Sequence, residues 1–180
     1  MPALDIDALD TLPRDLHQAI TTADLPPLDD GGANPRLAAY LTEFPTLGLT
    51  DTVTDDAIAL CKSGLWLLAG DLDRSHTISQ DLDSAEGSLW HGMMHRREGD
   101  FGNAKYWFRR AGDHPMYRQV VHHAPDLPAE LQRSGGLDPM AFVDACQAAT
   151  RGAGGSIDTA ACRRVQWVEW QCLFAACLAK

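Results

Sequence analysis

The sequence predicts an all-α domain of antiparallel helical hairpins, and three observations support this. Glycine and aspartate occur together at the ends of two apolar segments, as Gly70-Asp71 and Gly99-Asp100. Glycine permits the left-handed turn that ends one helix, and aspartate caps the next. The segments around these turns repeat with a spacing of 29 residues, which is typical of stacked hairpins. The C-terminal third adds long apolar segments with helical spacing, which predict a closing helical pair.

We expect one domain over residues 1–180, beginning with an irregular N-terminal segment. Residues 1–34 are rich in Asp, Pro and Leu, and we expect them to wrap over the domain with one short helix over 13–23. Pro35 suits the first turn of a helix that then covers 36–43.

The two hairpins are predicted within residues 52–116. Thr54 provides a cap for the first of four helices, which are expected at 57–69, 72–82, 84–98 and 101–111. Small residues occupy matching places in the two copies, because Ser63 aligns with Gly92 and Ser75 with Ala104. Small side chains at these places let the paired helices approach closely.

The closing helical pair is predicted within residues 138–180. Asp138-Pro139 is a cap followed by proline in the first helical position, so a helix should begin there and run to about Thr150. Residues 152–155 then form a turn, and residues 156–178 form a long final helix. Its aromatic residues, Trp167 and Trp170 among them, have a spacing typical of core packing.

The segment 98–111 resembles the turn and second helix of a tetratricopeptide repeat. The residues that carry the resemblance are Gly99, Phe101, Ala104, Phe108 and Ala111, together with Gly92 in the preceding helix. His95 departs from the family pattern, which has an aromatic residue there, and Pro115 comes one residue early. The resemblance implies a tetratricopeptide-like array, a superhelical scaffold used for binding.

A longer segment, His91 to Pro115, is also similar to a family of uncharacterised bacterial and fungal proteins. Its distinctive part reads His-Arg-Arg-Glu-Gly-Asp-Phe-Gly-Asn-Ala-Lys-Tyr-Trp-Phe-Arg-Arg from His95 to Arg110. Residues 75–80 and 141–144 share this similarity. It implies no particular activity.

Composition narrows the functional classes. Hydrophobic residues make up 45% and charged residues 22%, which is ordinary for a globular protein, and the formal net charge of −10 argues against nucleic-acid binding. No apolar run is long enough to span a bilayer, and the N-terminus does not read as a signal peptide. The five cysteines include no C-x-x-C pair, which favours reduced core residues in a cytoplasmic protein.

The polar chemistry is concentrated between His91 and Arg110. This window holds five basic and two acidic residues, a charge of +3, so the remainder of the chain carries −13. On a helical wheel, His91, His95 and Glu98 cluster opposite the apolar residues and should face water or a groove. Two histidines one turn apart, followed by a carboxylate, can offer three ligands to zinc, manganese or iron. Asp71, His76 and His114 are further candidate ligands from their positions in the repeat.

Two functions follow from this window, and one structural alternative accompanies them. The leading hypothesis is a binding or scaffold module with a groove for an acidic peptide or a small anion. The expected lining of the groove is His91, His95, Arg96, Glu98, Lys105, Tyr106 and Arg109. The second hypothesis is a metal-dependent enzyme with His91, His95 and Glu98 as ligands. The structural alternative is a buried polar network that determines how the hairpins stack.

Overall fold

The computed structural model describes the chain except residues 1–5, 7–8, 11, 23, 50–52 and 153–156. The described residues form an all-α fold, which confirms the predicted class. Their strands are limited to a short antiparallel pair, β1 (Gln132–Arg133) and β2 (Gly136–Leu137), in which Gln132 lies opposite Leu137.

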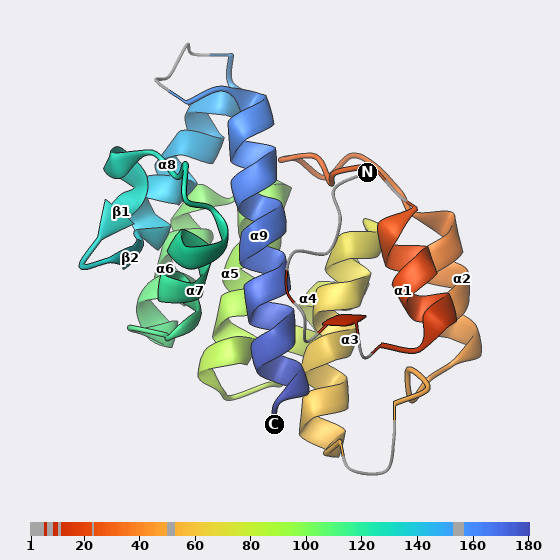
Figure 1. Cartoon of the computed structure of the whole chain (residues 1–180). Coiled ribbons are helices and arrows are strands. Elements are labelled where there is room, and N and C mark those ends of the chain that lie inside the picture. Colours follow the sequence, from red (N-terminus) through yellow and green to blue (C-terminus); the bar gives the residue numbers. More distant parts are fainter. Residues whose placement is uncertain (1–5, 7–8, 11, 23, 50–52, 153–156) are drawn as a thin grey trace.

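Two helices near the N-terminus confirm the elements predicted there. α1 (Arg14–Thr21) and α2 (Pro35–Glu43) lie side by side in Figure 1. Asn34 ties them together, because its side chain caps α2 at Leu37 N and donates to the carbonyl of Ala19 at 2.9 Å. The segment between them crosses to α5, where Arg97 donates to the backbone oxygens of Asp29 and Gly31.

The four helices of the hairpins begin and end close to the predicted residues. They are α3 (Asp55–Ala69), α4 (Leu72–Ser79), α5 (Ala85–Glu98) and α6 (Phe101–Ala111), and α4 ends three residues earlier than expected. Gly70 and Gly99 adopt φ angles of 85° and 86°, which an L side chain disfavours. The carboxylates of Asp71 and Asp100 cap α4 and α6, as the repeat predicted.

The small residues of the repeat lie where the helices of each hairpin meet. The hydroxyl of Ser63 donates to the carbonyl of Ser75 at 3.1 Å and joins α3 to α4. In the second hairpin, a Cβ on Gly92 would stand only 3.3 Å from the ring of Phe108. α4 also packs against α5, so the two hairpins are neighbours. The tetratricopeptide-like geometry of the array stays a prediction.

The C-terminal helices close the core. α8 (Pro139–Thr150) is capped by Asp138, as predicted, and α9 (Thr159–Leu178) is capped by Asp158. α9 begins three residues after the predicted start, and residues 153–155 of the predicted turn lie outside the described residues. Figure 1 shows α9 as a long central helix, which packs against α3, α5, α8 and α7 (Met116–His123). A 3-10 turn, Ala129–Leu131, precedes β1.

The core is continuous from the N-terminal helices to α9. All five cysteines are buried in it and free. Within the described part of the chain, no helix combines the length and the apolar character needed to cross a membrane.

Candidate metal centre

α5 lies in the middle of the molecule and is buried on nearly all sides. Its histidines were expected to face water or a groove, and this expectation needs correction: the exposed fractions of His91 and His95 are 2% and 8%. The helical wheel correctly separated them from the methionines. A helical wheel contains no information about neighbouring helices, however. α4 and α6 pack against α5, so the histidines are buried. Glu98, the last residue of α5, is half exposed.

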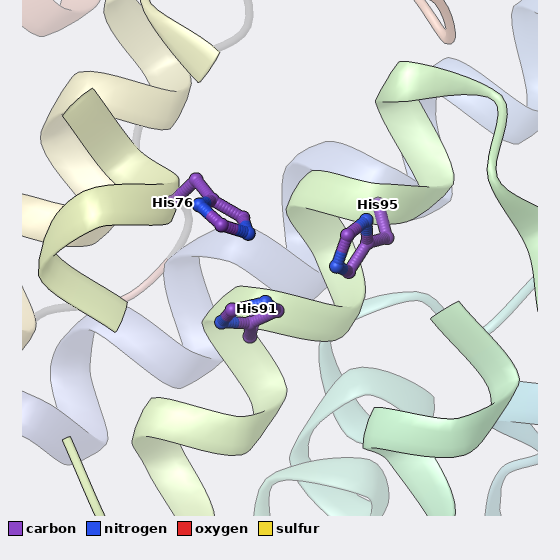
Figure 2. Close-up of side chains that lie close together, drawn as sticks. All are labelled: His76, His91 and His95. Carbon is purple, nitrogen blue, oxygen red and sulfur yellow. The ribbon is translucent and has the colours of Figure 1, made fainter. Parts of the chain in front are cut away.

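A third histidine joins this pair from the neighbouring helix. His76 of α4 lies opposite His91 and His95, which are one turn apart on α5 (Figure 2). The ring centroids of His76 and His91 are 4.6 Å apart, and those of His91 and His95 are 4.8 Å apart. One ring nitrogen from each residue lies within 4.8 Å of the other two. We call these three residues the histidine cluster.

Hydrogen bonds select the nitrogen that His91 presents. Its Nδ1 lies 3.1 Å from the hydroxyl oxygen of Ser79, and this hydroxyl also lies 3.2 Å from the carbonyl of His76. A hydroxyl has a single proton, which Ser79 donates to that carbonyl. Nδ1 of His91 is therefore the donor to Ser79, and the lone pair of the neutral ring is on Nε2.

Glu98 has the same effect on His95. One of its carboxylate oxygens lies 3.0 Å from Nδ1 of His95, so this nitrogen donates and Nε2 is the acceptor when the ring is neutral. In metal sites, a carboxylate behind a histidine orients the ring and makes it a stronger ligand. Glu98, which the sequence nominated as a ligand, is thus placed to support a ligand.

The environment keeps His91 neutral. Burial lowers the pKa of His91 to about 4, and the nearby His95 and His76 contribute to the shift. Trp107 of α6 covers the ring, with centroids 4.1 Å apart. A neutral imidazole is the form that binds metal ions, so His91 is ready to act as a ligand at neutral pH.

The other residues expected to line a groove lie elsewhere. The guanidinium of Arg96 is in the core, 1% exposed, where it pairs with Glu169 of α9 at 2.5 Å and stacks 4.4 Å from Phe142. Lys105 pairs with Asp144 of α8 at 2.6 Å. Arg109 is exposed one turn after Lys105.

These cations are not gathered around the histidines. Lys105 and Arg109 each lie two residues from Trp107, about 200° around the helix. They therefore leave α6 on the side away from the histidine cluster. Tyr106 is 51% exposed and meets Trp107 edge-on. Of the predicted groove residues, the structure brings together only His91, His95 and Glu98.

The remaining candidate ligands have other roles. Asp71 caps α4 and pairs with Arg74, whereas His114 faces Glu86 with 3.4 Å between Nε2 and the carboxylate. Ser79 and Trp107 were not predicted from the sequence as part of this site. The available signal was the hairpin itself: α4 and α5 run antiparallel around a short turn, so a histidine on α4 can meet a histidine on the facing side of α5.

Comparison with protein-family models, with curated proteins and with solved structures returned no match for this chain. The functional argument therefore depends on the geometry of the histidine cluster.

Proposed function

We propose that this protein binds a divalent transition metal ion, preferably zinc, through His76, His91 and His95. The observation that carries the proposal is the convergence of one nitrogen from each ring within 4.8 Å. Nitrogens that share a tetrahedral zinc ion at about 2.05 Å are roughly 3.4 Å apart. The widest pair therefore needs to approach by no more than about 1.4 Å, which is the scale of side-chain rotation.

The hydrogen bonds around the cluster also support a metal. Ser79 engages Nδ1 of His91, and Glu98 engages Nδ1 of His95. With Nδ1 engaged in both rings, Nε2 is the nitrogen that each ring can offer to a metal ion. Nitrogen donors of this kind suit zinc, and they also suit iron.

Two activities are compatible with such a centre. Three histidines that hold an ion with an open position are typical of catalytic zinc sites, in which a bound water acts as nucleophile. This version of the metal-dependent enzyme uses His76 as third ligand in place of Glu98. The alternative is a binding module for an acidic peptide or a small anion. A divalent ion among neutral imidazoles would keep its positive charge and so attract an anion.

Metal analysis of untagged protein tests the proposal. We expect one zinc per chain after dialysis against zinc and then metal-free buffer, and saturable binding by calorimetry. His76→Ala and His95→Ala should abolish this binding. His122→Ala is the matched control, because His122 and His123 form another adjacent pair, with ring centroids 4.9 Å apart, outside the cluster.

The variants must keep the helical circular dichroism of the wild type for the comparison to apply. His76 is the better first choice because it is only partly buried. Wild-type protein that binds no zinc, cobalt or iron would overturn the proposal. Unchanged binding in both cluster variants would overturn it equally.

A further inference from the structure

The chain provides the histidine cluster with three metal ligands. Among the described residues, the group that can share an ion contains His76, His91 and His95, with no Cys, Asp or Glu. The closest carboxylate in the hydrogen-bond network, that of Glu98, is bonded to Nδ1, the side of His95 that faces away from a metal on Nε2. Zinc in proteins takes four ligands, so one position remains for a ligand from outside the chain.

The structure indicates from which side an outside ligand can arrive. The cluster is walled on one side by α6, whose Trp107 covers His91. On the other side, His76 is partly exposed and Glu98 is 51% exposed at the end of α5. A ligand therefore reaches the ion past His76.

Charge determines the kind of ligand. A divalent ion held by three neutral imidazoles keeps its full charge of about +2, which favours an anion at the remaining position. The surroundings limit how negative that anion is, because Glu98 bonds to Nδ1 of His95 and Asp100 follows two residues later as the cap of α6. A singly charged ligand therefore fits better than a multiply charged one such as phosphate.

We propose that the metal held by His76, His91 and His95 keeps an exchangeable fourth position that binds a carboxylate. This inference rests on the proposed metal site and specifies its ligand. Two kinds of molecule can supply this carboxylate: a small organic acid, or an acidic peptide through an Asp or Glu side chain.

Cobalt substitution tests the inference, because the visible spectrum of cobalt reports its ligands. Cobalt-loaded wild-type protein is titrated with acetate, with phosphate and with the blocked peptide acetyl-Gly-Glu-Gly-amide. We expect a saturable spectral change at one site with acetate or the peptide, and at least tenfold weaker binding of phosphate. His122→Ala should behave as the wild type, and His76→Ala should show no saturable change.

The outcomes separate the two proposals. Stoichiometric cobalt binding with a spectrum that no carboxylate changes would overturn the exchangeable position and leave the metal site standing. Tighter phosphate than acetate binding would overturn the carboxylate assignment. Failure to bind cobalt, zinc or iron would overturn both. Peptide binding at least tenfold tighter than acetate would assign the ligand to an acidic peptide, and the reverse would assign it to a small acid.

Discussion

Individual hydrogen bonds determine which ring nitrogen of His91 and of His95 is available as a ligand. Ser79 and Glu98 each accept from an Nδ1 atom, so both rings on α5 offer the same nitrogen. Neither residue is one of the three proposed ligands. In the proposed metal site, fixed rings have fewer states to give up when a metal binds, which favours binding without adding a ligand.

Changing Glu98 tests this role. We expect Glu98→Ala to weaken zinc binding by about 10- to 100-fold, as for other carboxylates that support a histidine ligand. Glu98→Gln should have a smaller effect, because its amide oxygen still accepts from Nδ1 but carries no charge. Competition with a chromophoric chelator measures both. Glu130→Gln, on an exposed residue outside the cluster, is the control. Equal zinc affinity in the wild type, both Glu98 variants and the control would show that Glu98 has no positioning role.

At the scale of elements, α5 connects the molecule in two ways. One side presents the histidine cluster toward α4, and the other presents Arg96 to Glu169 of α9. This ion pair is almost completely buried, with side chains 1% and 0% exposed. The polar residues of α5 therefore combine a candidate site with a buried ion pair, which joins the second hairpin to the closing helix α9. They act as parts of two different contacts.

Two variants distinguish the buried ion pair from the surface cations of α6 by their effect on stability. Arg96→Met should lower the free energy of unfolding by about 3–5 kcal/mol, because it leaves the carboxylate of Glu169 buried without a partner. Replacing both Lys105 and Arg109 with Ala should cost no more than about 1 kcal/mol, since the Lys105–Asp144 pair is at the surface. Urea unfolding measures both.

A further variant checks the cause of the loss at Arg96. Adding Glu169→Leu to Arg96→Met removes the stranded carboxylate, so we expect most of the lost stability to return. A loss that stays the same in the double variant would mean that packing against Phe142 matters more than the ion pair. A large loss from the Lys105 and Arg109 double variant would place those cations in a structural network.

At the scale of the whole molecule, the burial of His91 couples stability to pH. Its pKa is about 4 in the folded protein, compared with an ordinary value of 6.5. The unfolded chain therefore binds a proton more readily between these values, and the folded state loses stability as pH falls through them. The loss between pH 7 and pH 5 is roughly 2 kcal/mol for metal-free protein.

Comparison with His91→Gln isolates this contribution. Urea unfolding at pH 7 and pH 5 gives a stability difference for each protein, and the wild type should lose about 2 kcal/mol more than the variant. Titrating groups common to both proteins largely cancel in the comparison. An equal loss in the two proteins would contradict the low pKa of His91.

Local features of the sequence determined much of this architecture. Helix ends could be predicted at Gly70-Asp71, Gly99-Asp100 and Asp138-Pro139, because capping and left-handed turns depend on a few consecutive residues. The pairing of His91 with His95 on one side of α5 was predictable for the same reason. Helical periodicity is a local property.

Only the tertiary structure decided which of these polar groups meet. Arg96 pairs with a carboxylate 73 residues away in the sequence, and a single-helix wheel gives no indication that this side of α5 is buried. His76 joins the cluster because α4 and α5 pack in a particular register. Such contacts depend on how whole helices pack, which no short segment encodes. The sequence therefore predicted histidines on one face, and the packing of α4 and α6 made that face a buried cluster of three.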